Sequence, residues 1–197
     1  MQNLKSLMLR ALVALAMFSS AGQLFASPVY HVSIDSAGLS GQGYLDFLFL
    51  GTASSATADV QLTNFTGDFD KSTYTKSNAE GALDSGVTIH NDTGWNEFGQ
   101  LANFGGLFTF DVQFSIANDA TGGSDLSIAL LDSGLNGYVG GTTGDMATFQ
   151  VYPGQPALFT VSDRAAVGPA AVPEPATLAE MASGLMLLFG ALRRRRP

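Results

Sequence analysis

The stretch Phe108-Thr109-Phe110-Asp111-Val112-Gln113-Phe114-Ser115-Ile116 alternates between apolar and polar residues at every position. In a β-strand successive side chains point to opposite faces, so this alternation places all five apolar residues on one face. A strand with one apolar and one polar face is typical of an antiparallel sheet that buries only one side. The sequence therefore predicts a half-buried strand over residues 108–116.

Weaker signals of the same kind run through the rest of the chain. They cover Val29–Asp35, Tyr44–Leu50, Ala58–Asn64, Gly86–His90, Leu126–Asp132, Met146–Tyr152 and Leu158–Ser162. Glycine-rich turns such as Gly122-Gly123 and Asn136-Gly137 separate them, and no helical run lies between them. Many short strands with such turns predict an all-β body, a single antiparallel β-sandwich of jelly-roll type.

Composition excludes several classes of function. Charged residues make up 13% of the 197-residue chain, and there is no cysteine, so disulfides, thiolate metal sites and a cysteine nucleophile are excluded. Residues 27–171 carry 15 acidic side chains against three basic ones, a formal net charge of −12 with histidine neutral. A phosphate-binding face needs clustered lysine and arginine, so we expect no nucleic-acid partner.

The first 26 residues are typical of a secretory signal peptide. Lys5 and Arg10 form a short basic region, and Ala11–Phe18 is an uncharged apolar run. This run is too short to cross about 30 Å of hydrocarbon, which favours removal over anchoring. We predict entry into the Sec machinery and cleavage by signal peptidase after Ala26, leaving Ser27 as the new amino terminus. The alternative is a buried amphipathic helix.

The last 26 residues have three parts in a fixed order. Val172-Pro173-Glu174-Pro175 comes first, an apolar segment over residues 176–192 follows, and Arg193, Arg194, Arg195 and Arg196 come next. Seventeen helical residues reach roughly 25 Å, a short transmembrane helix. The arginines hold its far end in the cytoplasm, so the body is displayed outside. Residues 27–163 are predicted to form the body, and residues 164–171 a linker.

This three-part tail resembles the PEP-CTERM sorting signal of Gram-negative bacteria. The resemblance implies that an exosortase, a membrane-embedded transpeptidase, recognises Pro173, Glu174 and Pro175 and then releases or transfers the body. These residues would be recognised as substrate and would not be catalytic. The alternative is a tail anchor that is never cut. The start Pro28–Asp35, the stretch Gly43–Phe47 after it and the stretch 95–98 are similar to one group of small PEP-CTERM proteins. This resemblance implies that the protein accompanies exopolysaccharide production, and it says nothing about an activity.

The sequence offers little for catalysis or metal binding. His31 alternates within the first predicted strand, and His90 ends another beside turn residues, so each is interpreted as structural. No nucleophile elbow, phosphate-binding loop or zinc-binding motif is present. A glycosidase needs only two carboxylates, but nothing in the sequence singles out a pair. The one metal hypothesis is calcium, held by Asp59, Asp68 and Asp70, with solvated turn aspartates as the alternative.

Trp95, the only tryptophan, is set among polar residues. An aromatic plate beside amide and carboxylate groups is what sugar recognition uses, which makes Trp95, Asn96, Glu97 and Gln100 candidate sugar contacts. The alternative is that Trp95 and Phe98 close one end of the sandwich core.

Together these observations predict a non-enzymatic exported protein, anchored transiently in the cytoplasmic membrane and then sorted to the cell surface or extracellular space. We expect a structural or adhesive component associated with exopolysaccharide or biofilm. A weak carbohydrate-binding module, with or without calcium, is the alternative. A glycan-active hydrolase is the third interpretation.

Overall fold

The structure, a computed structural model, describes residues 27–139 and 144–170. The predicted signal peptide (1–26) and the predicted sorting tail (172–197) lie outside the described residues. Among the residues that are described, no helix is long and apolar enough to cross a membrane.

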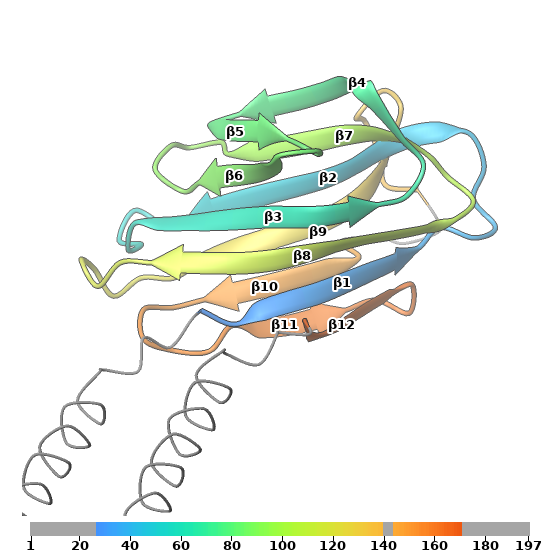
Figure 1. Ribbon diagram of the computed structural model, residues 1–197. Coiled ribbons are helices and arrows are strands. Elements are labelled where there is room, and N and C mark those ends of the chain that lie inside the picture. The colour runs from blue at the N-terminus through green and yellow to red at the C-terminus, as the bar shows by residue number, and fades with distance from the viewer. Residues whose placement is uncertain (1–26, 140–143, 171–197) are drawn as a thin grey trace, which may run out of the picture.

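The described residues form two antiparallel sheets and no helix, so the predicted all-β body is confirmed. One sheet has the strand order β12-β1-β8-β3-β6-β5, and the other β11-β10-β9-β2-β7-β4. The two sheets lie face to face as layers (Figure 1). The strands are β1 (Val29–Asp35), β2 (Gln42–Gly51), β3 (Ala58–Thr66), β4 (Phe69–Ser77), β5 (Ala79–Ala82), β6 (Gly86–His90), β7 (Glu97–Asn103), β8 (Leu107–Ile116), β9 (Ser124–Asp132), β10 (Ala147–Val151), β11 (Leu158–Val161) and β12 (Ala165–Pro169).

The strand pairing is nested along the chain. β1 pairs with β8, β2 with β7 and β3 with β6. β4 and β5 follow one another directly in the chain but belong to different sheets. β9, β10 and β11 extend one sheet, and β12 extends the other. The chain thus folds back on itself around the β4–β5 connection.

β8 lies between β1 and β3 in its sheet, and its alternation is as predicted. Phe108, Phe110, Val112 and Phe114 are buried, whereas the intervening polar residues are partly or fully exposed. Phe110 meets the opposite sheet directly, with its ring centroid 5.0 Å from that of Phe47 in a T-shaped arrangement. Aromatic rings from both sheets therefore form the centre of the core.

All eight predicted strands are present, within a few residues at each end. The sequence did not predict β4, β5, β7 and β12. The expectation of a linker over residues 164–171 is therefore wrong where β12 lies. Val167 of β12 pairs with Val32 of β1, and the guanidinium of Arg164 donates to the carbonyl of Ala37 at 2.9 Å. β12 is built of small residues without alternation, so pairing with β1 stabilises it rather than its own sequence pattern.

The two ends of the described chain leave the body side by side. β12 runs antiparallel to β1, and the Ala170 amide donates to the Val29 carbonyl at 2.9 Å. Both ends therefore emerge at the same end of the sandwich (Figure 1), here called the terminal end.

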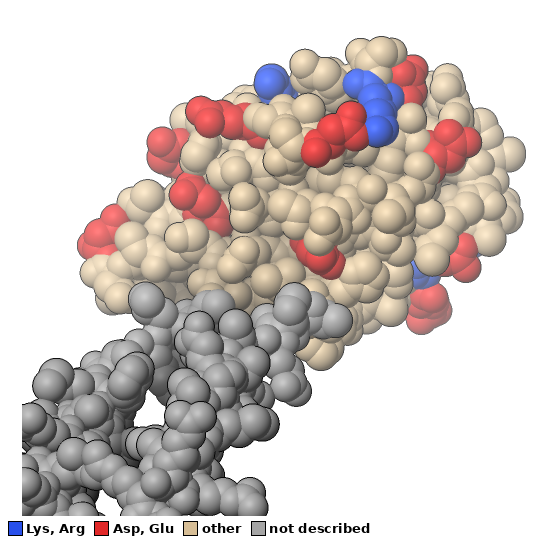
Figure 2. All heavy atoms as spheres, in the orientation of Figure 1, with Lys and Arg blue, Asp and Glu red and all other residues tan. Residues whose placement is uncertain are grey.

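Acidic side chains are scattered over the face of the body that Figure 2 draws and do not gather in one patch there. Figure 2 shows them spread over one face of the body, with few basic side chains among them. This distribution agrees with the net charge of −12 for residues 27–171. Self-repulsion of such a surface favours solubility.

Candidate functional site

Trp95 lies in the connection between β6 and β7, at the terminal end. Its side chain is 53% exposed, so the interpretation that it closes the core is wrong. Phe98, by contrast, is 1% exposed and does enter the core. The indole Nε1 donates to Glu97 Oε2 at 2.9 Å, which fixes the ring against the start of β7. Trp95 and Glu97 thus form a small exposed platform.

Asn96 and Gln100 do not belong to this platform, which corrects the predicted set of sugar contacts. Asn96 is fully buried, and its amide donates to the carbonyl of Phe49 at 2.8 Å while its Oδ1 accepts from Asn78 at 2.7 Å. Gln100 is 1% exposed and donates to the carbonyl of Thr73 at 2.9 Å. Both amides therefore satisfy backbone groups and cannot reach a ligand.

A buried carboxyl lies on the outer face of the same sheet. Asp46 of β2 pairs with Gly99 of β7, which in turn pairs with Thr75 of β4. A Cβ at Gly99 would lie 2.6 Å from Thr75 Oγ1 and 3.2 Å from Asp46 Oδ1, so both oxygens face the space that this glycine leaves open. Within residues 27–139 and 144–170, neither oxygen has a hydrogen-bond partner.

The pKa of the Asp46 carboxyl is raised from 3.8 to about 7, chiefly by burial, and the neighbouring carboxylates of Glu97 and Asp145 contribute in the same direction. The side chain is only 6% exposed, so the neutral form avoids placing an uncompensated charge away from water. The sequence pattern does not single out Asp46 as a site residue. The available signal was a single carboxylate inside the apolar run Tyr44–Leu50.

A glycosidase needs at least two carboxyl groups: one donates a proton to the leaving group, and the other acts as nucleophile or as general base. Glu97 can contact a ligand beside Trp95, but Asp46 is enclosed. The arrangement therefore suits surface contact through Trp95 and Glu97 better than acid–base chemistry by the pair.

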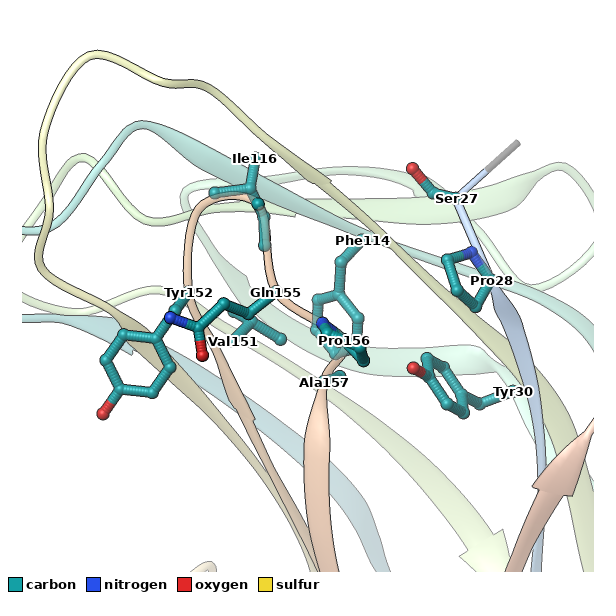
Figure 3. Close-up of a pocket in the computed structure, with 11 residues that line it drawn as sticks. Ser27, Pro28, Tyr30, Phe114, Ile116, Val151, Tyr152, Gln155, Pro156 and Ala157 are labelled. Carbon is teal, nitrogen blue, oxygen red and sulfur yellow. The ribbon is translucent and has the colours of Figure 1, made fainter. Parts of the chain in front are cut away.

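A second feature is a pocket of about 440 Å³ at the terminal end, between the start of β1 and the connection from β10 to β11. Figure 3 shows Tyr30 and Phe114 on one side, facing Pro156, whereas the ring of Tyr152 points away. The lining side chains carry no charge, and Ser27, the predicted new amino terminus, lies at the rim. Such a neutral, mostly apolar hollow is suited to an uncharged group.

The three calcium candidates already have partners, and Asp59, opposite His90 and Ser115, lies apart from Asp68 and Asp70. Asp59 of β3 bonds to His90 Nδ1 at 2.7 Å, Asp68 accepts from Asn103 at 3.0 Å, and Asp70 of β4 accepts from the Ser72 hydroxyl at 2.6 Å. That hydroxyl lowers the pKa of the Asp70 carboxyl. Among the residues described, no group of three or more His, Asp or Glu side chains is arranged to hold a metal ion.

The two histidines occupy surface positions on strands. His31 of β1 lies opposite Asp111 of β8, with Nδ1 2.7 Å from a carboxylate oxygen, and is exposed as predicted. His90 ends β6 and bonds to Asp59 of the neighbouring β3. Each histidine therefore takes part in a cross-strand pair. The strands bring neither histidine next to a serine in a nucleophile elbow, since the chain has none.

The predicted sorting residues Val172, Pro173, Glu174 and Pro175 and the cluster Arg193–Arg196 lie outside the described residues. No protein-family model, curated protein or solved structure matches this chain.

Proposed function

We propose that this chain is a non-enzymatic exported protein that an exosortase sorts to the cell surface or extracellular matrix. There it would act as a structural or adhesive component associated with exopolysaccharide. The observation that carries the proposal is the three-part tail: Val172–Pro175, the apolar segment over residues 176–192, and four consecutive arginines. Signal peptidase, the Sec machinery and the exosortase are the partners that this tail and the first 26 residues imply.

The placement of the chain ends supports this proposal. The signal peptide and the sorting tail both join the body at the terminal end, where Val29 and Ala170 are hydrogen-bonded. A body held by either segment would therefore present the same end to the membrane and project its opposite end outward. Cutting near residue 175 would leave β12 intact, because β12 ends at Pro169.

We assign the body to the jelly-roll type of β-sandwich. The support is the nested pairing of β1 with β8, β2 with β7 and β3 with β6, which is the pairing of a long hairpin rolled into two layers. This architecture serves many functions, so it adds nothing about ligand or activity.

The sorting proposal predicts that Glu174→Ala, or loss of Arg193–Arg196, leaves the protein unprocessed and cell-bound. The first change removes the charge of the recognition motif, and the second removes the charges that fix the helix in the membrane. Immunoblots of cells and medium would report the size and release of the chain. Glu80→Ala, which removes an exposed carboxylate of β5, is the matched control and should be processed normally. Unchanged size and release in both tail variants would contradict the proposal.

A carbohydrate-binding role is the second candidate, and the exposed Trp95 favours it. The indole face is open to solvent while its Nε1 is held by Glu97. A fixed aromatic plate beside a carboxylate can stack on a sugar ring and accept a hydroxyl hydrogen bond. One plate supplies only a few kcal/mol, so affinity would lie in the millimolar to micromolar range. Many copies on a polymer would still give firm retention.

We expect Trp95→Ala to fold normally, changing stability by less than about 1 kcal/mol, because the side chain is exposed. Retention of the processed protein on the host's own extracellular polysaccharide should fall, and the assay should be run with and without calcium. Tyr138→Ala is the control, since Tyr138 is 51% exposed and follows β9 at the opposite end of the sandwich. Equal retention of both variants and the wild type would exclude Trp95 as the contact.

A further inference from the structure

The four edge strands of the two sheets differ sharply in charge. β4 carries Asp70, Lys71 and Lys76, and β5 carries Glu80. Charges on an edge strand are a known protection against pairing with another chain. β11 and β12, which form the other two edges, carry no charged residue. The side of the body formed by β4 and β5 is therefore protected by charge against pairing with another chain, whereas the side formed by β11 and β12 is not.

β11 is the more exposed of the two unprotected strands. Leu158, Phe159 and Val161 are 62%, 43% and 46% exposed. No charged residue occurs between Met146 and Ser162, a long neutral stretch in a strongly acidic body. Large apolar side chains exposed together on an edge strand mark an interaction surface.

Some backbone amides and carbonyls of β11 are free to bond to another strand. The Ser162 amide donates to the Met146 carbonyl at 2.8 Å, and in an antiparallel pair such bonded residues alternate with unbonded ones. Thr160 and Leu158 therefore bond to β10, whereas the amides and carbonyls of Phe159 and Val161 point outward. Among the described residues, no strand pairs with this outer side of β11.

We propose that β11 pairs with β11 of a second copy of this chain, antiparallel, about a two-fold axis at Thr160. This register places Phe159 opposite Val161 of the second copy and Val161 opposite Phe159, so all four outward groups of each strand are bonded. Other registers in which the outward groups face each other bond fewer of them. The pairing joins two six-stranded sheets into one continuous sheet.

A second copy fits this surface because of charge. Two bodies of net charge −12 repel one another over most of their surfaces, and the neutral side at β11 and β12 is where they approach without placing carboxylates together. The contact is the same patch on both copies, so it closes as a dimer. The charged edges β4 and β5 prevent growth from the opposite side into a fibre. This inference goes beyond the sorting proposal and does not depend on it.

Cross-linking can test the register directly, because the chain has no cysteine of its own. Thr160 and its symmetry mate form an unbonded pair, whose Cα atoms lie about 4.5 Å apart, within the range of a disulfide. The full chain carrying Thr160→Cys would be solubilised in mild detergent, oxidised with copper phenanthroline and run on a non-reducing gel. Glu80→Cys, on the opposite edge, is the matched control. We expect about tenfold more disulfide-linked dimer from Thr160→Cys than from Glu80→Cys, given this geometry.

A second substitution distinguishes association through backbone hydrogen bonds from non-specific hydrophobic association. Added to Thr160→Cys, Val161→Pro removes an outward amide and should abolish the cross-link, whereas Val161→Ala keeps the amide and should retain most of it. Circular dichroism of each variant checks the fold. Equal cross-linking at positions 160 and 80 would overturn the proposal whatever Val161→Pro does. A cross-link that survives Val161→Pro in a folded protein would also overturn it.

Discussion

Phe110→Ala is expected to lower the free energy of unfolding of the body by about 3–5 kcal/mol, the range for a buried phenylalanine truncated to alanine. Phe110 is fully buried at the middle of β8, and its ring contacts Phe47 and Phe65, with centroids 5.0 and 5.7 Å away. Truncation leaves a cavity between the sheets that these rings cannot fill without moving strands. Urea denaturation of residues 27–170, followed by circular dichroism, measures the loss.

The neighbouring position on the opposite face of β8 supplies the control. Thr109 is only partly buried, and its hydroxyl is 2.6 Å from that of Thr66 on the surface. Thr109→Ala should therefore cost much less than Phe110→Ala, about 1 kcal/mol for the lost hydrogen bond. Similar costs at the two positions would mean that the faces of β8 have been assigned wrongly.

Asp46→Asn is expected to stabilise the protein at pH 8 and to change its stability little at pH 4. In the folded state the Asp46 pKa is about 7, against 3.8 for an ordinary aspartate, because the carboxyl is buried beside Glu97 and Asp145. Between these two values the folded protein holds a proton that the unfolded chain has released. The free energy of unfolding therefore falls as pH rises through this window. A difference of about three pKa units corresponds to a loss of about 4 kcal/mol above pH 8.

Asparagine stays neutral at every pH, so this loss disappears in the variant. Denaturant midpoints of the wild type and Asp46→Asn, measured from pH 4 to pH 8, should diverge as pH rises. Asp125→Asn, which removes an exposed carboxyl from β9 of the same sheet, should leave the wild-type pH dependence unchanged. Parallel curves for the wild type and Asp46→Asn would show that Asp46 does not hold the proton.

The strands that the sequence predicted share one property, namely an apolar face that the core covers. Phe108–Ile116 shows it most clearly, and Val29–Asp35 matches β1 at both ends. The four missed strands lack it for different reasons. β4 is an edge strand with polar residues on both faces, β7 is interrupted by Gly99 and Gln100, and β5 and β12 are short and built of small residues. Their pairing partners, not their own patterns, make them strands.

The candidate site was harder to predict, because burial and distant contacts decide it. The sequence does not distinguish exposed from buried polar residues around Trp95. Asn96 is buried and bonds to the carbonyl of Phe49, whereas Trp95 is exposed to solvent. Asp46 and Glu97 meet only because β2 pairs with β7, which places Leu48 opposite Glu97. Hydrophobic pattern carries no information on which strands become neighbours. The outward amides of β11 likewise follow from register alone.

The pairing of the first strand with the last has a consequence for how the chain folds. β1 pairs with β8 and β12, so the sheet that contains β1 stays incomplete until residue 169 has been synthesised. Nested, non-local pairing of this kind gives a high contact order, and such proteins fold in milliseconds to seconds rather than microseconds. Slow closure leaves strands such as β8 uncovered during synthesis, when they are open to chaperones. Under the proposed export route, this delay keeps the chain unfolded, and so able to cross the membrane, until its last strand has been exported.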